Sequence, residues 1–139
     1  MSKQQTIIPC LIYEDAPAAI DFLCRSFGFA RHLVVPGETP RDIVHAQLTL
    51  DGNMIMLSSA KPHSRERFSM VAPGATGGLV TACICVTLAD PDAHYARAAA
   101  AGAAIIDAPH DNPYGGRGYE ARDPEGNMWS FSSYDPWAG

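Results

Sequence analysis

The chain lacks the features that mark secreted, membrane and nucleic-acid-binding proteins. Its 139 residues include ten lysines and arginines against fifteen acidic residues, and the resulting net charge of −5 disfavours a nucleic-acid-binding surface. No apolar run approaches the roughly 20 residues that a membrane-spanning helix needs. Residues 1–5 lack the apolar centre of a signal peptide. These absences lead us to expect a globular protein of the cytoplasm, with no nucleic-acid or membrane partner.

Cysteine is also scarce. At 139 residues, with 47% apolar side chains, the chain is long and apolar enough for a real hydrophobic core without a disulfide framework. We therefore expect four reduced thiols: Cys10, Cys24, Cys83 and Cys85. Cys83 and Cys85 share one face of a predicted strand. A reactive thiol or a soft-metal site is one interpretation of this pair, and buried cysteines acting as small apolar residues are the commoner alternative.

What the chain does contain is a repeat. Residues 52–59 (GNMIMLSS) and 126–133 (GNMWSFSS) agree at five of eight positions and lie 74 residues apart. In a chain of this length, such a match predicts two copies of one structural unit. Two copies are too few for a solenoid, so we expect two modules that face each other.

Each copy has the pattern of a strand, a helix and three further strands. Asp15 and Asp90 are predicted helix N-caps, and Asp51-Gly52 is a typical two-residue hairpin turn. For the first copy we predict strands at 6–13, 30–35, 43–50 and 53–59, with a helix from the Asp15 cap to about Phe27. For the second copy we predict strands at 79–88, 104–107, 118–122 and 127–134, with a helix from the Asp90 cap to about Ala101. The segments 60–78 and 108–116 are expected to be long loops, which are often functional or mobile.

The hairpin turn also predicts which side chains share a face of each sheet, because paired residues project to the same side. One face of the first hairpin is wholly apolar and should pack on the helix: Val44, Ala46, Leu48, Leu50, Ile55 and Leu57. The other face, here called the mixed face, carries His45, Gln47, Thr49, Met54, Met56 and Ser58. In the second copy the mixed face is predicted to carry Cys83, Cys85, Thr87, Tyr119, Met128, Ser130 and Ser132. Opposed mixed faces would line a concave cleft suited to a small molecule.

The paired modules, together with the run YGGRGYEARDPEGNMWSF at 114–131, resemble the vicinal oxygen chelate superfamily. This superfamily includes glyoxalase I, bleomycin-resistance proteins, extradiol dioxygenases and fosfomycin-resistance enzymes. The resemblance implies an α+β fold in which two βαβββ modules form a cup-shaped mixed sheet. It implies a single domain over residues 1–139, with modules at about 6–59 and 79–134 joined by 60–78. It also implies a homodimer, with the cup closed either within one chain or across two.

The resemblance also implies where a metal would bind. Metal enzymes of this superfamily usually place a histidine seven residues before the helix-capping aspartate and a glutamate four residues after the hairpin glycine. The equivalent positions here hold Ile8, Cys83, Met56 and Ser130. A divalent ion that prefers imidazole and carboxylate ligands would find none of them. We therefore predict no metal ligands and no cofactor.

Single residues leave alternatives open. His45 is the one histidine predicted on a mixed face, as a general base, a hydrogen-bond donor to a ligand, or a residue that merely bridges strands. Arg117 could bind an anionic ligand, or could pair with Asp111 or Glu120 as loop scaffolding. Tyr114 and Tyr119 could stack on a planar ligand.

The leading hypothesis is metal-independent binding of a small, partly apolar or aromatic molecule, for sequestration or sensing. Its expected binding residues are His45, Gln47, Met54, Met56, Cys83, Cys85, Tyr114, Arg117, Tyr119, Met128 and Ser130. The alternative is a lyase or isomerase that acts next to a carbonyl, with His45 as base and Arg117 or Tyr119 stabilising an oxyanion. A weaker alternative is a metal-dependent enzyme of the glyoxalase or dioxygenase type, with an unusual site built from His45 and a cysteine.

Overall fold

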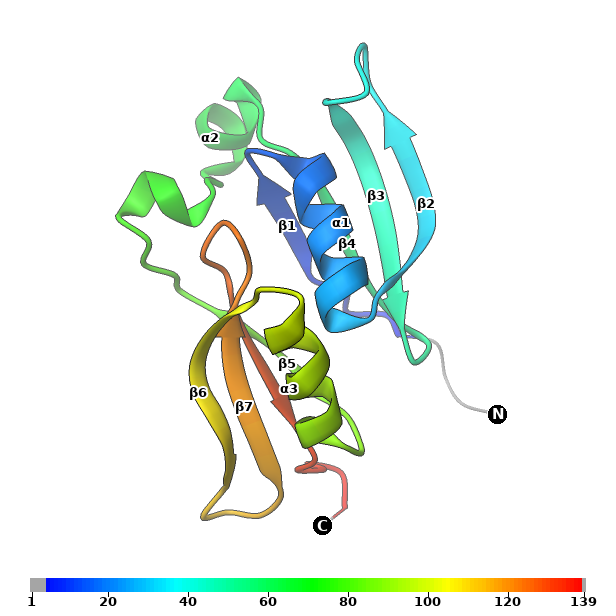
Figure 1. The fold of residues 1–139 in the computed structure, drawn as a ribbon. Helices are drawn as coiled ribbons and strands as arrows, with labels where there is room; N and C mark the ends of the chain where they lie inside the picture. The colour runs from blue at the N-terminus through cyan, green and yellow to red at the C-terminus, as the bar shows by residue number, and fades with distance from the viewer. Residues whose placement is uncertain (1–4, 139) are drawn as a thin grey trace.

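A computed structural model describes residues 5–138 and has an α+β architecture with two four-stranded sheets, as expected (Figure 1). The first sheet has the order β1-β4-β3-β2 and the second the order β5-β8-β7-β6. In each sheet the first strand pairs in parallel with the last, and the remaining pairs are antiparallel. The first module comprises β1 (Cys10–Tyr13), α1 (Ala16–Phe27), β2 (Ala30–Pro36), β3 (Ile43–Leu50) and β4 (Asn53–Ser59). The second comprises β5 (Cys83–Thr87), α3 (Pro91–Ala100), β6 (Ala104–Asp111), β7 (Arg117–Arg122) and β8 (Met128–Ser132).

Both helices begin at the predicted aspartates. The Asp15 carboxylate accepts a hydrogen bond from the Ala18 amide at 3.2 Å, and Asp90 accepts one from Ala93 at 3.1 Å. α1 ends before Gly28, whose φ of 86° lies in the left-handed region that glycine adopts without steric cost. The caps and the helix bounds predicted from the sequence are thus confirmed to within one residue.

Strand ends were predicted less well. The expected strands 6–13, 79–88 and 127–134 are shorter, whereas the strand expected at 104–107 continues to Asp111. The segment 60–78 is not a plain loop, since it contains the helix α2 (Pro62–Phe68) and the 3₁₀ turn η1 (Pro73–Thr76). A strand extends as far as a neighbouring strand can pair with it, and a single run of sequence does not reveal that neighbour.

The buried face of the first sheet follows the prediction for Ala46, Leu48, Ile55 and Leu57, which are at most 5% exposed. The exception is Val44, which we placed on that face and which is 57% exposed. Val35 of β2 pairs with His45, and the next residue, Pro36, pairs with Ile43, so the pairing skips Val44. This irregularity reverses the alternation of buried and exposed side chains on β3, and Ile43 is buried in place of Val44.

The second hairpin has a different register from the one we predicted. Arg122 pairs with Met128, and Tyr119 therefore lies opposite Phe131 on the helix side, where it is fully buried. The placement of Tyr119 on the mixed face was wrong. A connection of five residues, 123–127, shifts the pairing relative to the two-residue turn of the first hairpin, and Glu120 takes the place expected for Tyr119.

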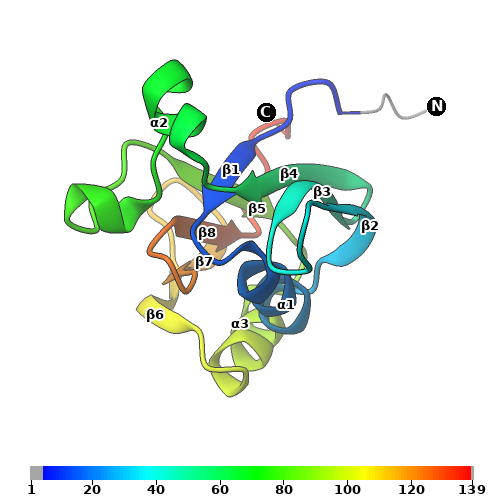
Figure 2. The same cartoon turned by 90° about the horizontal axis from the view of Figure 1, so that it is seen from above.

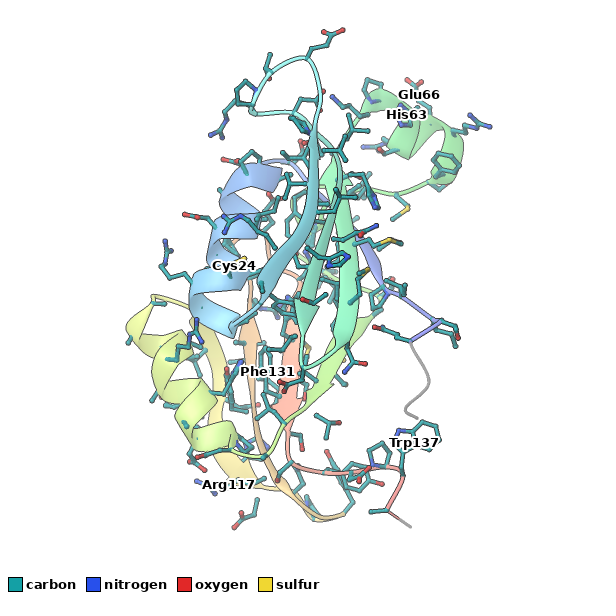
Figure 3. All side chains as sticks on the ribbon, turned by 90° about the vertical axis from the view of Figure 1, so that its right-hand side faces the viewer. Cys24, His63, Glu66, Arg117, Phe131 and Trp137 are labelled. Atoms are coloured by element: carbon teal, nitrogen blue, oxygen red, sulfur yellow. The ribbon has the colours of Figure 1, made fainter. Side chains whose placement is uncertain are left out.

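The two modules share one core on the helix side of the sheets. Phe27, at the end of α1, packs on Trp129 and Phe131 of β8, with ring centroids 5.4 and 4.8 Å away. The Tyr13 hydroxyl donates to the buried carboxylate of Asp123 at 2.6 Å. Helices α1 and α3 contact each other and lie on the same side of the sheets (Figures 2 and 3). The mixed faces of both sheets are therefore turned away from the helices.

The turn between β7 and β8 also holds the modules together. Glu125 in this turn accepts hydrogen bonds from the backbone amides of Glu14 and Asp15, at 2.7 and 2.8 Å. A carboxylate at this position satisfies donors at the start of α1 and interacts favourably with the helix dipole. Within residues 5–138, no helix is long and apolar enough to cross a membrane.

Candidate functional site

The candidate site is the surface formed by the two mixed faces. From the first module it carries His45, Gln47, Met54 and Met56, all half-buried, as expected. From the second module it carries Cys83, Cys85, Met128 and Ser130. In Figure 3 the helices lie on one side of the sheets, while α2 and Trp137 lie toward the other side. Eight of the eleven predicted binding residues are thus on one side of the molecule.

In the first module, three side chains form a row across the strands. Cys10 on β1 is in register with Met56 on β4, which is in register with Gln47 on β3. The Gln47 amide nitrogen lies 3.0 Å from Nε2 of His45. Gln47 and His45 are therefore in direct side-chain contact on this face.

The second module carries the equivalent row, and one member is a carboxylate. Cys85 on β5 is in register with Ser130 on β8, which is in register with Glu120 on β7. The Glu120 side chain is only 19% exposed, and Nε2 of His110 lies 3.6 Å from one of its carboxylate oxygens. Burial raises the pKa of Glu120, with a further upward contribution from Asp107 and an opposing one from His110. Glu120 is the residue that our sequence analysis missed, having weighed it only as a partner of Arg117. The length of the 123–127 connection was the signal that could have identified it.

Cys83 and Cys85 lie next to each other at the edge of the second sheet. Their sulfur atoms are 3.8 Å apart, and both residues are exposed. Burial of the thiol raises the pKa of Cys85, and the neighbouring Cys83 and Glu120 raise it further. A reactive thiolate needs cations or hydrogen-bond donors around it, and this environment has the opposite character. These surroundings therefore favour the thiol form of Cys85.

Two pockets of about 380 Å³ each lie where the two sheets meet. The first contains Met54 and Cys85 from the mixed faces, with Trp137 at its edge. The second contains Cys83 and Met128, next to the segment that follows α2. Ile84 lines both pockets, and the first continues along β5 to Thr87 whereas the second includes residues 79–83 before it. Residues from both modules thus line each hollow.

Three predicted binding residues lie elsewhere. Arg117 forms ion pairs with Asp92 of α3 at 2.9 Å and with Asp111 at 3.3 Å, so the scaffolding interpretation holds with Asp111 as the sequence suggested. The two carboxylates raise the pKa of Arg117, and the hydrogen bond from Arg117 lowers that of Asp92. Tyr114 is 67% exposed and packs edge-to-face on Tyr134.

Tyr119, the third of these residues, belongs to a buried hydrogen-bond chain that joins the modules. Its hydroxyl lies 2.6 Å from Nδ1 of His94, and Nε2 of His94 lies 2.8 Å from the Phe27 carbonyl oxygen. Because a carbonyl only accepts, Nε2 carries the proton and Nδ1 accepts from the tyrosine. Burial raises the pKa of Tyr119, and burial together with Arg97 lowers that of His94.

The donor atoms do not fit the divalent metal centre implied by the resemblance. Within residues 5–138, no three His, Cys, Asp or Glu side chains are grouped closely enough to hold a metal ion. Met56 lies opposite Cys10 and not Ile8, and Ser130 lies opposite Cys85 and not Cys83, which differs from the expected alignment. The pairs are thus a thiol beside a thioether and a thiol beside a hydroxyl. Imidazole and carboxylate, which such ions prefer, are missing from these pairs.

Comparisons with known proteins agree with this fold. The model of the Glyoxalase/Bleomycin resistance protein/Dioxygenase superfamily matches residues 6–131. An uncharacterized protein of Mycobacterium bovis is 34% identical over 131 residues, covering 94% of this chain and 84% of the relative. Among solved structures, TioX from Micromonospora sp. ML1 has a TM-score of 0.71 and 32% identity, covering 92% of this chain and 94% of TioX.

A further solved structure shows the same fold at lower identity. It is a bleomycin-binding protein from Streptomyces verticillus in complex with copper(II)-bleomycin. Its TM-score is 0.64 and its identity 22%, with 97% of this chain and 100% of that protein covered. At this identity the likeness concerns the fold alone.

Proposed function

Because the chain belongs to the Glyoxalase/Bleomycin resistance protein/Dioxygenase superfamily, we propose that it binds a small, partly apolar or aromatic molecule on the mixed faces of its sheets. The observation that carries this proposal is the composition of the mixed faces. Flexible methionines adapt to apolar ligands of varied shape, and His45, Gln47 and Ser130 supply a few hydrogen-bonding groups beside them. Binding on such a surface needs no metal ion held by imidazole and carboxylate ligands. Sequestration or sensing of the ligand are the roles that this arrangement suits.

A second copy of the chain completes the site in this proposal. Both mixed faces lie on the side of the sheets away from the helices, and their side chains remain partly open to solvent. A ligand needs most of its surface covered for tight binding, so a facing copy would close the cup. Light scattering after gel filtration would report the mass, and a protein that stays monomeric with and without ligand would exclude this part of the proposal.

Trp137 provides a built-in reporter for the binding test. It lines the pocket that contains Met54 and Cys85 and is 92% exposed, whereas the other tryptophan, Trp129, is fully buried. A panel of planar aromatic compounds would be titrated while tryptophan emission is recorded, with and without a chelator of divalent ions. We expect binders whose dissociation constants are the same in both conditions.

Two variants make this test specific. Replacing Met54 by alanine should weaken binding by about threefold to tenfold, because about 1 kcal/mol of apolar contact is lost. Phe68→Ala is the matched control, because Phe68 is an exposed apolar residue of α2 that lines neither large pocket. Affinity that disappears with the chelator would contradict the proposal, as would equal effects of the two variants.

The lyase or isomerase alternative retains one supporting observation. His45 contacts the Gln47 amide through Nε2 at 3.0 Å, and an imidazole held on the candidate surface is a group that can act as a base. Arg117 and Tyr119 do not support it, because the former is engaged by Asp92 and Asp111 and the latter by His94. Glu120, whose pKa is raised by burial, is a carboxyl group on the mixed face of the second module.

The two functions differ in what His45 does. Under the enzyme alternative, His45→Ala should abolish turnover and the rate should follow the titration of an imidazole. Under the binding proposal, the same change should weaken ligand affinity by only a few fold. Metal analysis of purified protein by plasma mass spectrometry addresses the weaker metal-enzyme alternative, since near-stoichiometric zinc, nickel, iron or manganese would support it.

A further inference from the structure

We propose that Cys83 and Cys85 form a dithiol site that captures a thiophilic d¹⁰ metal ion, independently of the organic ligand proposed above. The two sulfur atoms are 3.8 Å apart on the same face of β5. In a tetrahedral thiolate complex with metal–sulfur bonds of about 2.3 Å, two sulfurs stand about 3.8 Å apart. The pair therefore already has the spacing of two ligands to one ion.

The surroundings of the pair favour a metal ion over a nucleophilic thiolate. Burial, Cys83 and Glu120 all oppose a bare negative charge on Cys85. A divalent ion that replaces the two thiol protons leaves the net charge of the site unchanged. Burial and the neighbouring Glu120 therefore oppose ion binding far less than they oppose a bare thiolate. The balanced step is M²⁺ + 2 RSH → M(SR)₂ + 2 H⁺, in which both metal–sulfur bonds form as both protons leave and nothing is oxidised.

Access and neighbours are also consistent with an ion site. One large pocket reaches Cys85 and the other reaches Cys83, so open space borders both thiols. Met128, opposite Cys83 in the sheet register, places a thioether, a soft donor, beside it. With two thiolates as its protein ligands, the ion would keep open positions for solvent or an added ligand.

Two neighbouring thiols can also be oxidised to a disulfide, but the extended backbone of β5 disfavours that bond. Residues two apart on one face of an extended strand have Cα atoms about 6.6 Å apart. That separation is near the upper limit for a disulfide, whose usual value is about 5.5–6 Å. The extended backbone therefore keeps the pair available as a dithiol.

Cadmium(II) is the probe that reports thiolate ligation directly, through its sulfur-to-metal charge-transfer absorption. The reduced full-length protein would be titrated with Cd(II) at neutral pH, with a pH indicator present to count released protons. We expect one ion per chain, a charge-transfer band and about two protons released per ion. The apparent affinity should rise by up to a hundredfold per pH unit while both thiols are protonated, with Glu120, His110 and Asp107 as the other titratable groups on this face.

Single serine variants locate the site. Cys83→Ser and Cys85→Ser should each lower the Cd(II) affinity by more than about tenfold and reduce the charge-transfer band, because one thiolate cannot chelate. Both cysteines are exposed and serine is similar in size, so the fold should be retained, as an unchanged melting temperature would show. Cys10→Ser and Cys24→Ser are the matched controls and should bind as the unaltered protein does. The proposal is overturned by a full-strength band in either Cys83→Ser or Cys85→Ser, by a band that requires Cys10, or by the absence of a band in the unaltered protein.

Discussion

The two modules follow the same chain path but bury different amounts of their helices. Seven residues of α1 are buried, whereas only Pro91 and Ala98 of α3 are. The second module fills its core with Trp129, Phe131 and Tyr119 of its own sheet and with Phe27 from α1 of the first. The alanine-rich helix α3 leaves room for this aromatic insertion. The second module therefore depends on the first for a complete core.

The mixed faces of the two modules differ in charge. The row Cys10–Met56–Gln47 of the first module is neutral, whereas its counterpart Cys85–Ser130–Glu120 contains a carboxylate. Each row has a histidine at one end, since His45 contacts Gln47 and His110 lies near Glu120. The same fold position therefore supplies an uncharged hydrogen-bonding group in one module and an ionisable group in the other.

The largest loss of stability is expected from Phe27→Ala in the shared core. Removal of this fully buried ring should lower the free energy of unfolding by about 4 kcal/mol, because a cavity opens between α1 and β8. Urea denaturation followed by circular dichroism and by Trp129 emission should show one transition for both modules. The exposed Phe68→Ala should change stability by less than about 0.5 kcal/mol. Two separate transitions, with only the first module affected, would disprove the dependence of the second module on the first.

The substitution Asp123→Ala removes a second contact between the modules. The Asp123 carboxylate accepts hydrogen bonds from the hydroxyl of Tyr13 in the first module and from the indole of Trp129 in the second. Its removal leaves two buried donors without partners, which should lower the free energy of unfolding by about 3 kcal/mol. Asp135→Ala removes an exposed aspartate and serves as the control for this urea denaturation. Equal stability of the two variants would show that this contact contributes nothing.

A smaller effect concerns pH. Burial lowers the pKa of His94, with Arg97 lowering it further and the bond to the Phe27 carbonyl opposing. The unfolded chain therefore takes up a proton near the ordinary pKa of about 6.5, and the native state does so only at lower pH. Stability should be full above about pH 6.5 and should fall as the pH decreases toward the native pKa.

The measurement is the free energy of unfolding at about pH 7.5 and about pH 5.5, in the unaltered protein and in His94→Gln. The variant should lose less stability on acidification, because its side chain does not titrate. A loss as large as that of the unaltered protein would assign the acid sensitivity to other groups.

The smallest effect that we expect concerns the rows Cys10–Met56–Gln47 and Cys85–Ser130–Glu120. Glu120→Gln makes the row of the second module resemble that of the first, which contains Gln47. Removal of the carboxylate should lower the pKa of the Cys85 thiol and increase its alkylation rate by about twofold to threefold at neutral pH. Cys10 acts as the internal reference in mass-spectrometric readout, and Glu66→Gln is the control. An unchanged ratio of Cys85 to Cys10 alkylation would show that Glu120 does not influence the thiol.

Local signals in the sequence predicted part of the candidate site. The Asp51-Gly52 turn sets the pairing of β3 with β4, and it placed Gln47, Met54 and Met56 on the mixed face correctly. The second hairpin carried no such short turn, so its register was inferred from the repeat. That inference put Tyr119 where Glu120 lies, whereas Tyr119 is on the helix side of the sheet.

The helices, their aspartate caps, the first hairpin and most of its apolar face could be predicted from the sequence, because each depends on residues close together along the chain. The insertion of Phe27 between the modules, the pairing of Arg117 with Asp92 and the two pockets along β5 depend on the tertiary structure. It also decided the spacing of the Cys83 and Cys85 sulfurs. These features depend on contacts between distant residues and on side-chain rotamers, and neither has a period or a local motif that can be read along the chain.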